Sequence, residues 1–395
     1  MQICHVTPHL PPEQAANALL PFHLGTYARA AGIEVTYVAH PPRQQGAREH
    51  ADVERPGHVQ WIPHRRASLA IARHARVDTM RAVADIVRLA APQVAAADLV
   101  HLHSNGLLVE VAAWLAERKG KPTVVTLYGT EIWHYKPRRF LDLFTRAYRQ
   151  AAHVTFYSQG LLNHAVNAGL ARRDLSVIYP PVAPDFMGTR ISMHQARERL
   201  GIRNRHVIVN VKRLHPLAGQ RFLLQAMGEV IRWFPDSRLI ICGTGPLRDE
   251  LAAIARGAGV EGHVTFAGLV DNATIACYDM AADAFALPSL LEACPTVALE
   301  ALACGTPVVS SDNPGGVELN DLFGVDVSIV PRENPLALAD AIIRVLETGR
   351  RVSQETARQL RSDFSGEAVA RQYLSVYERA LGRAATGGPE ALASS

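Results

Sequence analysis

Two glutamates, Glu292 and Glu300, stand eight positions apart in the stretch whose residue types most clearly suggest chemistry. An apolar run at 284–287 precedes them and is short enough for a buried strand. A helical pattern follows over 296–303 and ends at Gly305. The pattern therefore predicts a strand–loop–helix unit with one carboxylate in the loop and a second inside the helix.

The start of that helix is a second chemical feature. Thr296 and Val297 lie in its first turn, where backbone amides lack partners within the helix and the helix dipole is positive. Such amides suit a phosphate group. Two glutamates alone would usually form a solvated helix face. Glu300, however, is flanked by Leu299 and Ala301, which favours a functional acid over a merely structural one.

Cations and glycines follow two other predicted strands. Lys212 and Arg213 end the strand at 207–211, and they should point apart unless the strand stops before them. Gly243 and Gly245 follow the strand at 238–242 and open a helix. This context suits backbone amides that approach a phosphate or a nucleoside, although a G-x-G-P sequence is often only a tight turn.

Polar side chains also follow strands in the first half of the chain. His103 ends the strand predicted at 99–102, and Tyr128 follows the strand predicted at 123–127. Ligands gather at the carboxyl ends of parallel strands, so both are candidate site residues. A tyrosine can form hydrogen bonds but does not titrate near neutrality. For His103, a rim histidine satisfied by neighbouring protein groups is an equally good interpretation.

Composition and charge exclude several classes of protein. The net charge of +4 over 395 residues gives no reason to expect nucleic acid as a partner. The five cysteines form no C-x-x-C pair and indicate reduced thiols in a cytoplasmic protein. The start of the chain does not resemble a signal peptide, and no apolar run is long enough for a transmembrane helix. A basic segment at 136–141 could favour an anionic acceptor or the inner face of a membrane.

Apolar strand patterns alternate with helical patterns along most of the chain, which predicts an α/β protein with two parallel, doubly wound Rossmann-like sheets. The proline-rich stretch around 179–184 is the expected hinge. We predict a first domain over 1–183 and a second over 184–363. An amphipathic helix is expected at 364–381 and a disordered tail at 382–395.

The region around the two glutamates resembles the E-x7-E region of retaining nucleotide-sugar glycosyltransferases, glycosyltransferase family four. The features that agree, in order, are the apolar strand, P-S-x-x-E, L-E-A-x-A-x-G-T-P-V-V and x-G-G-x-E. The resemblance covers nearly the whole chain and is strongest over 207–338. It implies a GT-B architecture, in which two Rossmann-like domains face a cleft and the C-terminal helix crosses back to the first domain.

The resemblance also implies roles for single residues. Arg213 would hold the diphosphate of a nucleotide diphosphate sugar together with the amides near Thr296, Glu300 would bind the ribose hydroxyls, and Glu292 the transferred sugar. The backbone near Val270 would meet the nucleobase. Neither a cofactor nor a metal is expected, because the chain lacks the D-x-D triplet that metal-dependent glycosyltransferases use.

Three positions depart from the pattern of the family. Ala218 stands where the family has a lysine on the diphosphate, and Lys212 could restore that charge. Tyr128 replaces a histidine that contacts the transferred sugar. Ala15 and Ala16 replace a glycine pair that lets the backbone touch the diphosphate, and they lose the freedom to adopt positive φ.

The resemblance therefore implies a hexosyltransferase that retains anomeric configuration, needs no metal, and acts on an unidentified glycan, lipid-linked glycan or small molecule. Two other functions stay open. One is a GT-B epimerase or phosphorylase, and the other is a non-catalytic protein that binds sugar nucleotides. Product analysis with the donor alone would separate the first of these from a transferase, and turnover of the donor would separate the second.

Overall fold

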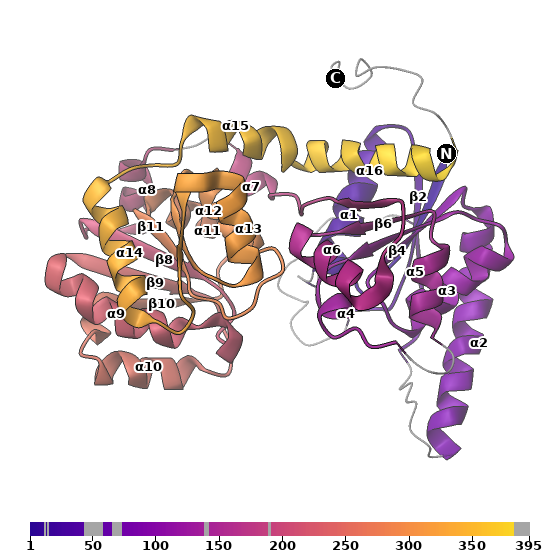
Figure 1. Ribbon diagram of the computed structural model, residues 1–395, viewed down its shortest axis with the longest axis horizontal. Helices are drawn as coiled ribbons and strands as arrows, with labels where there is room; N and C mark the ends of the chain where they lie inside the picture. Colours follow the sequence, from indigo (N-terminus) through magenta and orange to yellow (C-terminus); the bar gives the residue numbers. More distant parts are fainter. Residues whose placement is uncertain are drawn as a thin grey trace. The chain divides into compact units, whose positions relative to one another are not determined.

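The computed structural model describes residues 1–11, 13, 16–42, 58–64, 73–137, 142–188 and 191–382 (Figure 1). Ala15, the part of the basic segment at 138–141 and the predicted tail beyond Gly382 lie outside the described residues. The chain divides into two compact units. Unit 1 is Met1–Tyr179 together with the segment from Val369 onward, and unit 2 is Pro180–Ala368.

Unit 1 contains a seven-stranded parallel sheet in the order β3-β2-β1-β4-β5-β6-β7. Its strands are β1 (Gln2–Val6), β2 (Glu34–Ala39), β3 (Val59–Trp61), β4 (Leu99–His103), β5 (Thr123–Leu127), β6 (His153–Phe156) and β7 (Leu175–Val177). Its helices are α1 (Ala16–Ala30), α2 (Arg73–Ala96), α3 (Leu107–Arg118), α4 (Thr130–Trp133), α5 (Leu143–Gln150) and α6 (Gln159–Ala165), which a π-helical turn, η1 (Val166–Leu170), extends.

Unit 2 contains a six-stranded parallel sheet in the order β10-β9-β8-β11-β12-β13. Its strands are β8 (His206–Val211), β9 (Ser237–Cys242), β10 (Val264–Gly268), β11 (Ala284–Leu287), β12 (Val308–Ser311) and β13 (Val327–Val330). Its helices are α7 (Pro184–Met187), α8 (Met193–Leu200), α9 (Gln220–Trp233), α10 (Arg248–Gly257), α11 (Asn272–Ala281), α12 (Thr296–Ala303), α13 (Pro314–Phe323), α14 (Pro335–Thr348) and α15 (Gln354–Asp363). Short 3₁₀ turns are η2 (Pro216–Ala218), η3 (Glu261–His263) and η4 (Gly324–Asp326).

The core of unit 2 shows why its sheet is so apolar. Helices α9, α10 and α14 pack against one face, and a cluster of fully buried residues joins them to the strands; examples are Leu223, Met227, Leu239, Ile241 and Ile342. Helices α11 and α12 contact β8, β11 and β12 on the other face, and α8 packs against α11 (Figure 1). Strands buried on both faces need an apolar side chain at nearly every position, and β11, with its sequence AFAL, meets that requirement.

The last helix, α16 (Gly366–Ala380), belongs mostly to unit 1, because the division between the units falls inside it, between Ala368 and Val369. Its bounds differ by one or two residues from the amphipathic helix predicted at 364–381. The division after Tyr179 falls a few residues before the boundary predicted after 183. Within the described residues, none of the helices is both long and apolar enough to cross a bilayer.

Helix α2, which the structure describes from Arg73 onward, continues through a proline to Ala96. Pro92 lies inside α2, and a proline normally marks the end of a helical pattern. The helix continues past it because Val94 and Ala90 are fully buried on the same element, so packing outweighs the missing backbone hydrogen bond.

Candidate functional site

The order of strands in unit 2 identifies where a ligand should bind. From β8 the chain moves outward to β9 and β10, then returns to the other side of β8 with β11 and continues to β12 and β13. The direction in which successive strands are added to the sheet thus reverses between β8 and β11. In doubly wound sheets the loops at the carboxyl ends of two such strands separate and leave a crevice for ligands. The predicted residues Lys212, Arg213 and Glu292 all follow one of these two strands.

An ion pair connects the two loops at this switch point. The Nζ atom of Lys212, after β8, lies 2.6 Å from Oε1 of Glu292, after β11. The two side chains are 28% and 11% exposed, so the pair is only partly open to solvent. β8 ends at Val211, and the side chain of Lys212 is therefore free to turn toward β11.

Arg213 differs from its neighbour. Its side chain is exposed, and it forms no ion pair with any residue in the part of the chain that the structure describes. Its backbone is fixed, since the side-chain amide of Gln220 donates through Nε2 to the carbonyl oxygens of Lys212 and Arg213 at 3.4 and 3.3 Å. An exposed guanidinium on a fixed backbone is available to an anion.

The loop that carries Glu292 is held by the start of α13. The backbone N–H of Gly315 donates to the carbonyl oxygen of Glu292 at 3.0 Å, and a Cβ at Gly315 would press on Pro295 and Ala293. Deeper in the same loop, Ser289 is fully buried and its carbonyl oxygen accepts from the side-chain amide of Asn313 at 3.0 Å. These contacts fix the position of Glu292 before any ligand arrives.

The second predicted acid lies in a group of carboxyls. Burial, followed by the nearby carboxylate of Asp185, raises the pKa of Glu300 to about 7, and Lys212 partly opposes the shift. Burial and then Glu300 raise the pKa of Asp279, in α11, well above its usual range. Asp279 is fully buried, and neither of its carboxylate oxygens has a hydrogen-bond partner among the described residues. Burial therefore disfavours the charged form of Asp279 beside Glu300.

The start of α12 has the geometry predicted for it. The helix begins at Thr296 after Pro295, which provides no side-chain cap for the first amides. Thr296 and Val297 are partly exposed. The N-terminal amides of α12 therefore remain available to an anionic group, and the positive end of the helix dipole points the same way.

The glycines predicted to approach a phosphate serve a packing role. A Cβ on Gly243 would overlap the carbonyl oxygen of Lys212, and a Cβ on Gly245 would overlap that of Leu214. The two glycines thus let the loop after β9 lie directly against the backbone that carries Lys212 and Arg213. Val270 is partly exposed in the loop between β10 and α11.

Unit 1 has its own switch point, between β1 and β4, and polar side chains gather beneath it. His5 in β1 and His103 at the end of β4 are fully buried, and His5 Nδ1 lies 2.9 Å from His103 Nε2. The other nitrogen of His103, Nδ1, lies 2.7 Å from the hydroxyl of Tyr128. His103 is therefore not open to a ligand itself, and it reaches the partly exposed edge of the sheet through Tyr128.

The neighbouring histidine connects the sheet to α16. His101 Nδ1 lies 2.7 Å from the hydroxyl of Tyr377, and His101 Nε2 lies 2.7 Å from the hydroxyl of Thr126. Thr126 also contacts the hydroxyl of Tyr373 at 3.3 Å. Because Tyr373 and Tyr377 are four positions apart, they lie on one face of α16. The helix therefore covers a polar stripe of the sheet with hydroxyl groups.

The imidazoles of His5, His101 and His103 bring ligand nitrogens within 4.8 Å of one another, a spacing that could accommodate a metal ion. Five of their six ring nitrogens already have hydrogen-bond partners, and only His5 Nε2 has none among the described residues. A metal would have to displace several of those bonds. The expectation that the protein needs no metal stays a prediction.

The remaining predicted residue of unit 1 is Ala16, which is exposed at the first position of α1. Glu131, three positions after Tyr128, has a structural role. It is buried, and it accepts hydrogen bonds from the hydroxyl of Ser104 and from the backbone of Gly129, the latter at 2.8 Å. It thereby joins the loops after β4 and β5.

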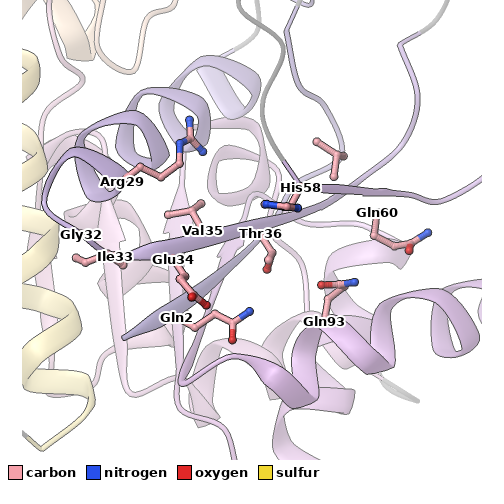
Figure 2. A pocket seen from close by; sticks show the side chains of 11 residues that line it. Gln2, Arg29, Gly32, Ile33, Glu34, Val35, Thr36, His58, Gln60 and Gln93 are labelled. Carbon is pink, nitrogen blue, oxygen red and sulfur yellow. The ribbon is translucent and has the colours of Figure 1, made fainter.

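A separate pocket of about 660 Å³ lies at the opposite edge of the sheet of unit 1, at the amino-terminal ends of β1, β2 and β3 (Figure 2). Gln2, Glu34, Thr36, His58 and Gln93 are among the side chains that line it. Parallel sheets bind ligands at their carboxyl ends, so its position gives no reason to connect this pocket with the residues above.

Asp279 and His5 are among the cluster residues that were not predicted from the sequence. Asp279 lies in α11, far along the chain from Glu300, and its only signal was an acid in an apolar context. His5 gave a clearer signal, because β1, like β4, places a histidine on an otherwise apolar strand. His5 and His101 lie side by side on one face of the sheet because they are paired in the neighbouring strands β1 and β4. This pairing is a property of the fold and not of either strand's sequence.

Two families of known proteins match the chain. The family described as "Glycosyl transferases group 1" matches residues 192–363, and the family described as "Glycosyltransferase Family 4" matches residues 22–186. The first match lies within unit 2, and the second covers most of the N-terminal part of unit 1.

Individual relatives agree with the family matches. The chain is 31% identical over 249 residues to a GDP-mannose-dependent alpha-(1-6)-phosphatidylinositol monomannoside mannosyltransferase of Mycolicibacterium smegmatis, covering 60% of this chain and 65% of that protein. It is 32% identical over 299 residues to the putative teichuronic acid biosynthesis glycosyltransferase TuaC of Bacillus subtilis, covering 73% and 68%. The first of these matches thus spans slightly less than two thirds of the relative.

Solved structures share the fold. The crystal structure of Anabaena HepE in complex with UDP superposes with a TM-score of 0.75 at 22% identity and covers 96% of this chain and 100% of that one. A sucrose-phosphate synthase from Thermosynechococcus elongatus gives a TM-score of 0.72 at 19% identity, covering 97% and 100%. At these identities the likeness concerns the α/β fold with two Rossmann-like units, as predicted.

Proposed function

Because this chain belongs to the group 1, family 4 glycosyltransferases, we propose that it transfers a hexosyl group from a nucleotide diphosphate sugar to an acceptor hydroxyl, with retention of configuration and without a metal ion. The observation that carries the proposal is the arrangement at the switch point of unit 2. There, Lys212 after β8 pairs with Glu292 after β11, the exposed Arg213 comes next after Lys212, and Glu300 lies in the helix that follows Glu292.

In this proposal the donor's diphosphate binds where positive charge is available. Arg213 is exposed and unpaired among the described residues, and the first amides of α12 have no side-chain cap. Both would stabilise the negative charge that grows on the departing diphosphate. Such fixed donors can fill the role that a divalent ion fills in metal-dependent enzymes, and this supports metal independence.

Glu300 and Glu292 would bind the sugar parts of the donor. Glu300 would accept hydrogen bonds from the ribose hydroxyls, and its ionised form would accept them most strongly. Glu292 would contact the transferred sugar, and Lys212 would neutralise its charge and restore the second cation that Ala218 does not supply. Because Glu292 is engaged by Lys212, it is poorly suited as a nucleophile. The departing phosphate oxygen would take the acceptor's proton on the face it leaves, which preserves configuration.

The proposed acceptor is a hydroxyl of a glycan or lipid-linked glycan. The mannosyltransferase of Mycolicibacterium smegmatis is named for a phosphatidylinositol monomannoside, and TuaC is named for teichuronic acid biosynthesis. An acceptor of this kind would bring the protein to the cytoplasmic face of a membrane as a peripheral enzyme.

A screen of sugar nucleotides tests the proposal. The purified protein is heated with UDP, GDP, ADP and dTDP sugars in turn, and a true donor should raise the unfolding temperature, since a ligand at 100 times its Kd adds about 2.7 kcal/mol of stability.

The stabilising donor is then incubated with the protein, both alone and together with membrane extract. Transfer to extract supports a transferase, and a new sugar or sugar phosphate from the donor alone supports an epimerase or phosphorylase. Binding without turnover supports a non-catalytic protein. Absence of any stabilising nucleotide would contradict the proposal.

A further inference from the structure

His5, His103 and Tyr128 in unit 1 are connected by two consecutive hydrogen bonds. The distances between their heavy atoms do not show which atom of each bond carries the proton. His5 Nδ1 faces His103 Nε2 at 2.9 Å, and His103 Nδ1 faces the Tyr128 hydroxyl at 2.7 Å. Both histidines are fully buried. Burial, followed by the charge of Arg29, lowers the pKa of His5 to about 3, and burial followed by the neighbouring histidines lowers that of His103 well below its usual value. Both rings are therefore neutral at physiological pH.

A neutral imidazole carries one N–H donor and one lone-pair acceptor, so each ring has two possible forms. The unpartnered atom decides between them. His5 Nε2 is buried and has no hydrogen-bond partner among the described residues. If that nitrogen carried the proton, the single N–H of the ring would have no acceptor, whereas a proton on Nδ1 is paired with His103 Nε2. Among backbone groups, orphaned buried N–H donors are rarer than under-satisfied acceptors, and we apply the same preference to this ring. The proton of His5 therefore belongs on Nδ1.

The remaining assignments follow one after another. His5 Nδ1–H donates to His103 Nε2, so the single proton of His103 is on Nδ1. His103 Nδ1–H then donates to the oxygen of Tyr128. The Tyr128 hydroxyl accepts this bond, so its own proton points away from His103. Tyr128 is partly exposed just past the end of β5, the edge at which ligands bind in sheets of this kind.

We infer that His5 is a positioning residue which, through His103, fixes Tyr128 as a hydrogen-bond donor to the substrate. The inference rests on the proposed function, because it takes the partner of Tyr128 to be an oxygen of the sugar or acceptor. The inference adds one requirement to the proposed function: the substrate oxygen that contacts Tyr128 must accept a hydrogen bond from it. If His103 were instead protonated at Nε2, the Tyr128 hydroxyl would donate its proton to His103 Nδ1. Tyr128 could then only accept a hydrogen bond from the substrate.

The first experiment reads the tautomers directly and needs no activity. Protein labelled with ¹⁵N-histidine is examined near neutral pH by long-range ¹H–¹⁵N NMR, and single-histidine variants assign the signals of His5 and His103. Both rings should be neutral and protonated at Nδ1. A His103 ring protonated at Nε2 would overturn the inference. Because this result is independent of turnover, it stays valid even if the proposed glycosyl transfer proves wrong.

The second experiment uses turnover and a double-mutant cycle. His5→Phe removes the donor to His103 but keeps a ring of similar size, and it should lower kcat about tenfold, the equivalent of one lost hydrogen bond. His5→Asn places an amide N–H near the position of Nδ1 and should recover most of that loss. In a Tyr128→Phe background, His5→Phe should change kcat by less than about twofold, since its effect passes through the missing hydroxyl.

A matched control separates this role from general damage to the fold. His153 is another buried histidine of unit 1, and its Nε2 lies 2.9 Å from the Ser176 hydroxyl. It takes no part in the hydrogen bonds that connect His5 and His103 to Tyr128. His153→Phe should leave kcat near that of the unaltered protein. An equal loss from His5→Phe with and without the Tyr128 hydroxyl would overturn the inference. If His5→Phe fails to fold, His5→Asn and the NMR measurement still decide it.

Discussion

Lys212 Nζ lies 2.6 Å from Glu292 Oε1, and this ion pair joins the carboxyl ends of the two strands between which the sheet of unit 2 reverses direction. Lys212 also opposes the upward shift in the pKa of Glu300. One cation thus acts on both acids of the predicted motif. The pair is partly shielded from solvent, so its two charges interact more strongly than those of an exposed pair.

Lys212→Ala should reduce donor turnover at least about tenfold, which corresponds to roughly 1.4 kcal/mol in the barrier. The change removes the counter-charge of Glu292 and a cation from the neighbourhood of the diphosphate. Steady-state kinetics with the donor found in the screen measures the effect. Arg221→Ala is a suitable control, because Arg221 also pairs with a glutamate of unit 2, Glu250, but is well exposed. Equal activity in both variants would show that Lys212 does not serve the site.

Arg213→Ala should remove most activity, by about 10²–10³-fold in kcat, the usual loss for one preorganised donor to developing charge. Arg213 is exposed and forms no ion pair within the described ranges, so its removal should cost little stability. Kinetics and thermal unfolding are measured on the same preparation. Arg232, which is exposed and pairs with Glu229 on α9, provides the control Arg232→Ala. Near-normal turnover in Arg213→Ala would mean that the diphosphate is held elsewhere.

Donor binding should depend on pH through Glu300. Burial, followed by Asp185, raises the pKa of this carboxyl to about 7, so it is protonated below that pH and ionised above it. Ribose hydroxyls donate to the ionised form. Donor affinity should therefore fall by up to about tenfold per pH unit as the pH decreases below the pKa. Calorimetric titrations between about pH 6 and pH 8 measure this dependence.

The matched variant for this prediction is Glu300→Gln, which cannot ionise. It should bind the donor more weakly by about 1–3 kcal/mol at high pH, the usual cost of losing a hydrogen bond to a charged group, and its affinity should no longer change with pH. The unliganded protein should lose stability as the pH rises toward the raised pKa, because the folded state holds that proton more tightly than the unfolded chain. An identical pH dependence in the variant would assign the titration to another group.

Retention and metal independence form one prediction about the product. An α-linked donor should give an α-linked product, and the rate should be unchanged in EDTA, because in the proposed mechanism Arg213 and the first amides of α12 would take the place of a divalent ion. Proton NMR of the anomeric signal gives the configuration. Loss of activity that returns on addition of Mg²⁺ or Mn²⁺, or a β-linked product, would contradict this.

The central strands of both sheets could be predicted from the sequence, whereas several edge strands could not. β5 and β11 have the predicted bounds, because each is a continuous run of buried apolar side chains. The strands that were missed are β3, β7 and β13, and each lies at the edge of its sheet. Edge strands are short and partly exposed, so no apolar run marks them.

The candidate site shows a similar limit. Sequence placed Lys212 and Glu292 at the ends of two strands, but could not predict that they pair, since the side-chain direction depends on β8 ending at Val211. Asp279 and Glu300 interact although 21 positions separate them, because α11 and α12 pack on the same face. Local patterns carry no information on such contacts between elements.

The last prediction concerns the attachment of α16 to unit 1. Tyr377→Phe removes the hydroxyl that lies 2.7 Å from His101 Nδ1 and leaves a fully buried nitrogen without its partner. The cost should be about 1–3 kcal/mol in the stability of the helix on the sheet. Amide hydrogen exchange in the peptide that covers α16 should therefore accelerate roughly 5- to 150-fold, while exchange in α9 of unit 2 stays unchanged. Tyr278→Phe is the control, because Tyr278 is half-buried in α11 and its hydroxyl bonds to no residue that the structure describes. Unchanged exchange in α16 would show that apolar packing alone holds the helix, and that the hydroxyl groups facing His101 and Thr126 contribute no net stability.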